Sequence, residues 1–226
     1  MSDTFTAEQR AKLEDYLANH ILPSGLGSEE SACSIAAINL AINGELKDNI
    51  PPCMSSVLGR ATIRLQDAMP DEMRNSFRYK RLLPDMVGTG RDNESERLAV
   101  LIDWMWSTVL PQLQPLADKK GFGAEWRDMC RLKTRETAAN AANAAADAAA
   151  RAANADANAN ANAADAAANA NAAAAYAAAA NANAAAYAAA DAAYAAADAA
   201  ADTFWKTVDP IGVLERMTYL KTGKQP

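Results

Sequence analysis

The residues that could carry out chemistry are few and widely spaced. His20 is the only histidine in the chain, and the nearest serines are Ser24, Ser28 and Ser31. Nucleophilic catalysis needs a base within hydrogen-bond reach of the serine or cysteine that it activates. His20 lies instead on a segment whose apolar residues are spaced for packing. The sequence therefore predicts no catalytic residue, and we expect the protein not to be an enzyme.

The cysteines do not form a metal-binding pattern. There are three of them, Cys33, Cys53 and Cys130, and none is part of a closely spaced pair. Structural zinc sites usually draw on paired ligands a few residues apart. An odd number of cysteines at wide spacing is more typical of free thiols than of disulfides. We expect buried thiols, no metal and no other cofactor.

One glycine-rich loop could bind an anion through its backbone N–H groups. It comprises residues 87–91, Val-Gly-Thr-Gly-Arg, and precedes a predicted helix. The loop follows no predicted strand and lacks the lysine of a phosphate-binding loop, so a plain turn between helices is the favoured interpretation. The next helix opens with three acidic residues, Asp92, Glu94 and Glu96. Their carboxylates lie near the positive end of the helix dipole, which stabilises the helix.

The elements that carry these residues are predicted to be helices. Thr6 and Gln9 form a capping-box pattern before a helix that ends ahead of Pro23. Ser28 is expected to cap a buried central helix over 32–42 that stops at Asn43–Gly44. A third helix is predicted to start at the proline pair 51–52 and to end before residue 70. In the first and the third helix the apolar residues recur at intervals of three and four, so they share one face. These residues are Leu13, Tyr16, Leu17 and Ile21 in the first helix and Met54, Val57, Leu58, Ala61 and Leu65 in the third.

Later segments continue the helical pattern. A short charged segment follows, and Pro84 is expected to end it; its large apolar residues are Phe77, Tyr79, Leu82 and Leu83. An amphipathic helix is predicted after the glycine-rich loop, with prolines 111 and 115 ending or kinking it. A further helix over 124–132 is predicted to run without a break into an alanine tract. No segment alternates apolar and polar residues with a period of two, so the fold class is predicted to be all-α.

The alanine tract spans residues 138–201 and contains 45 alanines among 64 residues, with no glycine or proline. Alanine is the strongest helix former, so one long helix of about 96 Å is expected, with a bend or hairpin most favoured at the asparagine-rich stretch 153–162. Steps of three, four and four place most polar residues on one stripe and leave the opposite face to methyl groups. That stripe contains the residues predicted to contact a partner: Tyr176, Tyr187, Tyr194, Asn158, Asn162, Asp165, Asp191 and Asp198.

Two resemblances follow from these patterns. The 3-4-4 tract is similar to the alanine-rich helices of type I antifreeze proteins, which implies an ice-binding face; their regular threonine is absent here. Residues 22–40 and the Asp103-Trp-Met-Trp106 segment look like uncharacterised bacterial and prophage proteins with alanine-rich tails, a resemblance that implies no known activity. The repetitive tract is also compatible with an artificial or computationally generated sequence.

Three segments are therefore predicted: a helical domain over 1–137, an alanine-rich helical rod over 138–202 and a C-terminal apolar segment over 203–226. The last should be buried or dock through Phe204, Trp205, Leu214 and Leu220. We expect a non-catalytic interaction protein whose alanine-rich helix packs against a protein partner or a second copy. The alternatives are an ice-binding helix and an acidic, phage-type counter-defence decoy.

The net charge of the chain argues against two classes of binding partner. Its net charge is −6, which disfavours contact with nucleic acid or with anionic membranes. The acidic N-terminal residues lack the pattern of a signal peptide, so a cytoplasmic location is expected.

Overall fold

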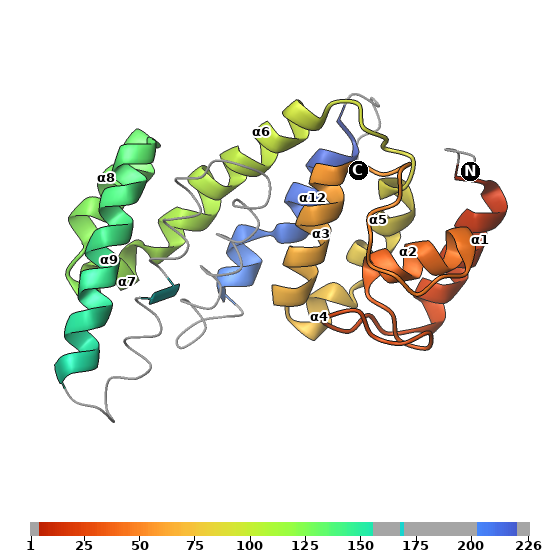
Figure 1. Cartoon of the computed structure of the whole chain (residues 1–226), viewed down its shortest axis with the longest axis horizontal. Helices are drawn as coiled ribbons and strands as arrows, with labels where there is room; N and C mark the ends of the chain where they lie inside the picture. The colour runs from red at the N-terminus through yellow and green to blue at the C-terminus, as the bar shows by residue number, and fades with distance from the viewer. Residues whose placement is uncertain (1–4, 156–167, 170–202, 221–226) are drawn as a thin grey trace. The chain divides into compact units, whose positions relative to one another are not determined.

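A computed structural model describes residues 5–155, 168–169 and 203–220 (Figure 1). Within these residues the chain forms helices and turns, with two isolated β-bridges and no strand, which confirms the all-α class. The helices belong to two compact units. Unit 1 comprises Met1–Val100 and Pro210–Pro226, and unit 2 comprises Leu101–Asp209. The predicted segment boundaries at residues 137 and 202 stay predictions.

Unit 1 is a helical bundle built around a short apolar helix, α2. Its helices are α1 (Ala7–Asn19), α2 (Ser34–Asn43), α3 (Ser56–Ala68), α4 (Asp71–Arg74), α5 (Phe77–Met86), the first part of α6 (Glu94–Trp104) and α12 (Pro210–Thr218). Helix α2 packs against α1, α3 and α5, while α12 packs against α3 and α5. Ile35, Ala36, Ala37 and Ile38 of α2 have no exposed surface. The predicted central position of this helix is confirmed.

Local signals fix several helix ends as expected. Thr6 and Gln9 form both hydrogen bonds of the capping box at the start of α1. Gly44 ends α2 with a φ of 75°, in the left-handed region that glycine adopts without a steric penalty.

Other predicted boundaries in unit 1 are wrong. Helix α2 begins after Cys33, because Ser28 is engaged in a turn with Ser31. Helix α3 begins after Ser55, whose hydroxyl accepts the backbone N–H of Leu58. Pro84 lies inside α5 rather than ending it. Because it stands in the last turn, its missing N–H group removes only one of the final hydrogen bonds of the helix. Ile21 lies beyond the end of α1 and is 66% exposed, so it does not belong to the buried face.

Unit 2 begins within α6, which passes into a π-helical turn, Met105–Val109, and a 3₁₀ turn, Leu110–Leu113. Pro111 cannot donate to the preceding turn, and a widened turn followed by a tight one accommodates it. Helices α7 (Gln114–Lys120), α8 (Gly123–Leu132) and α9 (Arg135–Ala155) follow, and residues 203–208 are also helical. The core contains large aromatic side chains: Trp104, Trp106, Phe122, Trp126, Phe204 and Trp205.

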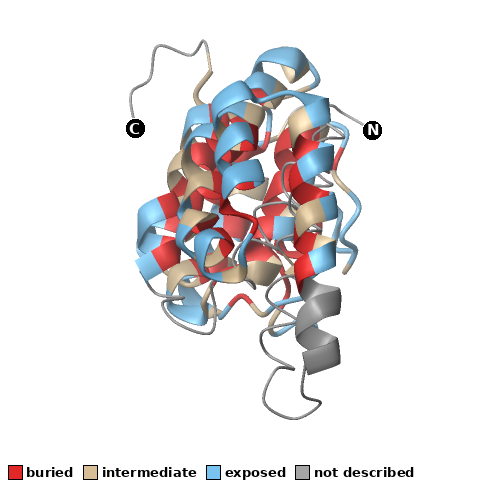
Figure 2. Cartoon of the chain, turned by 90° about the vertical axis from the view of Figure 1, so that its left-hand side faces the viewer, coloured by how far each residue is buried: buried red, intermediate tan, exposed pale blue. Residues whose placement is uncertain are grey.

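Helices α8 and α9 are separated by a break that the sequence prediction missed. Lys133 adopts a φ of 54° and ends α8, and its backbone N–H donates to the carbonyl of Met129. Thr134 and Thr137 then form side-chain hydrogen bonds with each other's backbone at the start of α9. This break lets α9 pack back against α8. In Figure 2 the helices nearest the viewer have a buried side and an exposed side.

No helix in the described part of the chain has both the length and the apolar character needed to cross a membrane.

Candidate functional site

Helix α9 contains the beginning of the alanine tract, and one of its faces is buried while the other is exposed. Five alanines are buried: Ala138, Ala141, Ala142, Ala145 and Ala148. Asn140, Asn143 and Asp147, which start the predicted polar stripe, are exposed. The buried and exposed sides can be followed along α9 in Figure 2. In this part of the tract the methyl face is the packing face.

The methyl face of α9 packs against α8 and α7. Alanine side chains allow helix backbones to approach more closely than larger residues do. Each alanine buries little area, so the stability of the contact depends on close fit rather than on large apolar side chains. Trp126 and Met129 of α8 and Ala117 of α7 are fully buried, as a closely fitted contact requires.

The residues predicted to contact a partner lie outside the described part of the chain. These are Tyr176, Tyr187, Tyr194, Asn158, Asn162, Asp165, Asp191 and Asp198. Their role in contacting a partner therefore stays a prediction. So does the expectation that the alanine tract forms one long helix or a bent one.

The four predicted docking residues are divided between the two units. Phe204 and Trp205 are buried in unit 2, with their ring centroids 5.6 Å apart in an edge-to-face arrangement. There Trp104 donates its indole N–H to the carbonyl oxygen of Val208 over 2.6 Å. Leu214 is fully buried in unit 1, whereas Leu220 is half-buried. Packing inside the chain accounts for the first three.

The glycine-rich loop does not present its N–H groups to a ligand. The N–H groups of Gly88 and Gly90 both donate to the carbonyl oxygen of Cys53, over 2.9 and 3.0 Å. The φ angles of these glycines, 86° and 60°, are the left-handed values that this reverse turn requires. The loop is therefore the turn between helices that the sequence favoured.

Glu94 lies in the first turn of α6, as expected, and has a second structural role that the sequence did not indicate. It accepts hydrogen bonds at the start of α3, from the backbone N–H groups of Ser56 and Val57 over 2.7 and 3.0 Å. The hydroxyl of Ser55 donates to it over 2.9 Å. Burial opposes ionisation of this carboxyl, but these hydrogen bonds outweigh burial and lower its pKa. Glu94 is thus a capping group rather than an acid or base.

The thiols are not arranged for nucleophilic chemistry. Cys33 is buried, Cys53 and Cys130 are half-buried, and none of the three is in a disulfide. Burial raises the pKa of the Cys33 thiol and brings the pKa of Cys130 to about 11, so the reactive thiolate is disfavoured at neutral pH. Within residues 5–155, 168–169 and 203–220, no three His, Cys, Asp or Glu residues are grouped so that they could hold a metal ion.

Unit 1 carries a groove that sequence reasoning missed, which we call the α1–α5 groove. Its volume is about 950 Å³. It is lined by residues from α1, from α5 and from their neighbours: Arg10, Glu14, Leu17, Ala18, Asn75, Phe77, Lys80, Arg81, Pro84, Asp85 and Tyr219. A smaller hollow of about 420 Å³ shares Arg10, Asp85 and Tyr219 with it.

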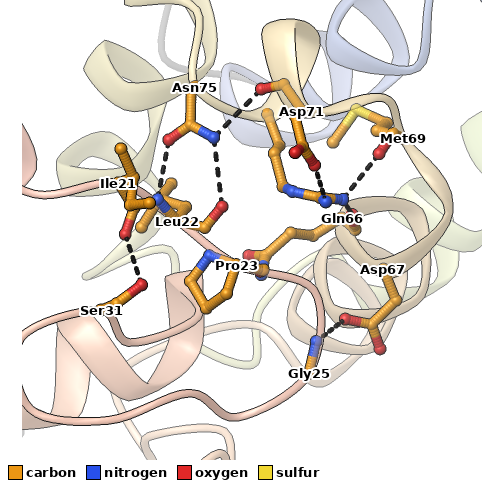
Figure 3. Close-up of polar contacts among 11 residues, drawn as sticks. Ile21, Leu22, Pro23, Gly25, Ser31, Gln66, Asp67, Met69, Asp71 and Asn75 are labelled. Atoms are coloured by element: carbon orange, nitrogen blue, oxygen red, sulfur yellow. Dashed lines mark hydrogen bonds and ion pairs between the residues drawn. The ribbon is translucent and has the colours of Figure 1, made fainter.

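A set of polar contacts fixes one end of this groove (Figure 3). Asn75 accepts the backbone N–H of Leu22 over 2.7 Å and donates to the carbonyl of the same residue over 3.1 Å. Asn75 therefore pairs with Leu22 as a neighbouring strand would. Nearby, the buried Arg74 donates to the carbonyls of Gln66 and Met69. The Asn75 bonds tie the segment after α1 to the end of α4, and the Arg74 bonds tie the end of α3 to α4, which directly precedes α5.

The other end of the groove is fixed by Asp85. Its carboxylate accepts hydrogen bonds from Arg10 over 2.6 Å and from the hydroxyl of Tyr219 over 2.8 Å. Burial and the hydrogen bond to Asp85 raise the pKa of Tyr219 to about 12, so the phenol stays protonated at neutral pH. Arg10 also pairs with Glu14 over 2.8 Å. The α1 and α5 walls are thus held by charged contacts.

The smaller hollow reaches Arg97, whose side chain is buried. Its guanidinium donates to the backbone carbonyls of Met217 over 3.0 Å and of Asp92. Burial lowers the pKa of Arg97. Since its bonds join the end of α12 to the loop before α6, we assign Arg97 a structural role.

The groove could not have been recognised from sequence because its lining residues come from separate helices. Phe77, which the sequence pattern placed in a short charged segment, is 80% exposed. The available signal was the helical spacing of Phe77, Lys80, Arg81 and Pro84 on the same helix as the buried apolar residues Tyr79, Leu82, Leu83 and Met86. Comparison with protein-family models, with curated proteins and with solved structures found no match.

Proposed function

We propose that this chain is a non-catalytic helical interaction protein whose alanine-rich helix uses its methyl face for close packing against another helix. The observation that carries the proposal is the sidedness of α9, where the methyl face is buried and the polar stripe is exposed. The same 3-4-4 pattern continues in the sequence beyond Ala155. Those residues offer a partner, or a second copy, the kind of face that α8 accepts inside unit 2.

The other described features are consistent with an interaction protein. The hydrogen bonds of the glycine-rich loop and of Glu94 are used within the fold, and burial disfavours the thiolates of Cys33 and Cys130. Ice binding would require the methyl face to be exposed as a flat surface. In α9 that face is occupied by protein, so the described part of the tract supports packing over ice binding.

Photo-crosslinking tests this proposal. A photoreactive phenylalanine analogue is placed at Tyr176, Tyr187 or Tyr194 in the full chain, which is then irradiated in cells that produce it. We expect a discrete crosslinked product, either a dimer or a complex with one other protein. By helical spacing, Ala167 and Ala178 fall on the face opposite the polar stripe, so replacing both with leucine should abolish that product. The matched control is leucine at Ala139, which is exposed on α9.

The same preparations separate this function from ice binding. An interaction helix should show no thermal hysteresis in the parent protein. Hysteresis that is lost in the Ala167→Leu/Ala178→Leu variant, with molar mass and melting temperature unchanged, would overturn the proposal.

A further inference from the structure

The α1–α5 groove combines an apolar floor with an exposed aromatic side chain. Leu17 and Pro84 are buried at its base. Phe77 stands at one end with 80% of its surface exposed, although it is one of only four phenylalanines in the chain. Large aromatic residues at the edge of a hollow are typical of the anchoring positions of protein interfaces.

The charges in the groove do not cancel locally. Its lining contains two carboxylates, Glu14 and Asp85, and Arg10 forms ion pairs with both. Lys80 donates to the neutral backbone carbonyl of His20 over 2.7 Å. Arg81 is exposed, and no described carboxylate forms an ion pair with it. Lys80 and Arg81 are therefore two uncompensated cations in a chain whose net charge is −6.

The spacing of these residues defines the shape of the ligand. Phe77, Lys80, Arg81 and Pro84 stand at i, i+3, i+4 and i+7 on α5, so they share one face of that helix. The distance along α5 from Phe77 to Asp85 is about 12 Å at 1.5 Å per residue. That length matches about two turns of a helix laid beside α1 and α5, which is the geometry of helix-in-groove recognition.

We propose that the α1–α5 groove binds an acidic amphipathic segment of a partner protein. Apolar side chains of that segment pack on Leu17, Pro84 and Phe77, and its carboxylates pair with Lys80 and Arg81. The Arg10–Asp85–Tyr219 contacts hold the far end of the groove in the open shape that the segment requires. This inference concerns unit 1 and does not depend on the alanine tract.

Charge complementarity selects this occupant over two others. The residues after Leu220 include Lys221 and Lys224 and no acidic residue, so the C-terminal end of the chain has the wrong charge for the groove. A nucleic acid would bring phosphates beside Glu14 and Asp85, which are carboxylates on the groove wall. An acidic peptide meets Lys80 and Arg81, neither of which forms an ion pair with a described carboxylate, and leaves the existing ion pairs intact.

Peptide display on the full chain tests the inference. Random segments of about twelve residues, long enough for the helical turns described above, are selected on the immobilised parent protein. Affinities of the enriched peptides are then measured by fluorescence anisotropy against Arg81→Glu and Phe77→Ala. Both positions are exposed, so the variants should fold, as far-UV circular dichroism will check. Arg60→Glu and Leu132→Ala are the matched controls, since these residues are exposed and lie outside the groove.

The expected peptides carry net negative charge and apolar residues at helical spacing. Arg81→Glu and Phe77→Ala should each weaken binding about tenfold or more, which corresponds to about 1.4 kcal/mol, while the controls leave it unchanged. Binding should also weaken as salt is added. A failure to enrich any peptide, enrichment without acidic residues, or equal binding to the groove variants would overturn the inference. So would a parent dimer that Arg81→Glu converts to a monomer, because the occupant would then be a second copy. These outcomes are independent of the photo-crosslinking experiment, which tests the alanine tract alone.

Discussion

Glu94 illustrates what a single residue does in this fold. Its carboxylate holds the first backbone N–H groups of α3, which a helix cannot satisfy by itself. Sequence reasoning placed it correctly at the start of a helix but assigned it to its own helix dipole. The partner in space, 37 to 39 residues away along the chain, carries no local signal. The position of Glu94 in the sequence indicated a stabilising role at the start of its own helix, and only the tertiary structure showed that it also caps α3.

We predict that Glu94→Gln lowers the free energy of unfolding at pH 7 by about 1–2 kcal/mol, because the amide cannot replace both acceptor oxygens. The pKa of Glu94 is lowered in the folded state, so its contribution is present above its unfolded pKa of about 4.3 and is lost as the pH falls through the folded value. Urea unfolding at pH 7 and at pH 3 should therefore show a difference between parent and variant that shrinks at pH 3.

Glu72→Gln is the control for this prediction, since Glu72 is an exposed acid in the first turn of α4. It should leave stability nearly unchanged at both pH values. An equal loss in both variants, or a loss in Glu94→Gln that persists undiminished at pH 3, would contradict the capping role.

At the scale of elements, the methyl face of α9 is the feature that sequence predicted best. The 3-4-4 spacing indicated which side of the helix is polar, and the exposed Asn140, Asn143 and Asp147 agree with it. The break at Lys133 was missed because a lysine in the left-handed region is uncommon and glycine is the usual signal. Thr134 was the available clue, since threonine commonly precedes a helix.

Leucine at Ala141 should destabilise the packing of α9, whereas leucine at Ala139 should not. Ala141 has no exposed surface, so a larger side chain must displace α8 or α9 at a cost of about 1–3 kcal/mol. Ala139 is exposed two residues away, and leucine is nearly as good a helix former as alanine. Urea unfolding followed by circular dichroism compares the two. If both substitutions have the same effect, the methyl face is not closely packed.

At the scale of the whole molecule, sequence treated residues 203–226 as one apolar segment. In the structure, residues up to Asp209 belong to unit 2 and the following helix α12 belongs to unit 1, while the predicted segment boundaries stay predictions. The Asp209–Pro210 pair was a readable signal for a helix start, because proline favours the first position of a helix. Which core each half completes depends on packing between distant parts of the chain, and no local pattern encodes that.

This division predicts that two substitutions in the C-terminal region act on different units. Leu214→Ala removes a fully buried side chain from unit 1, and Trp205→Ala removes one that is 4% exposed from unit 2. Such truncations typically cost about 2–5 kcal/mol. Hydrogen exchange read by mass spectrometry should then show faster exchange in α2 and α3 for Leu214→Ala and in α7 and α8 for Trp205→Ala. Leu132→Ala, at a position that is 46% exposed, should change neither set. Equal acceleration of both sets by either core substitution would mean that the chain unfolds as one cooperative body, and the assignment of two units would be wrong.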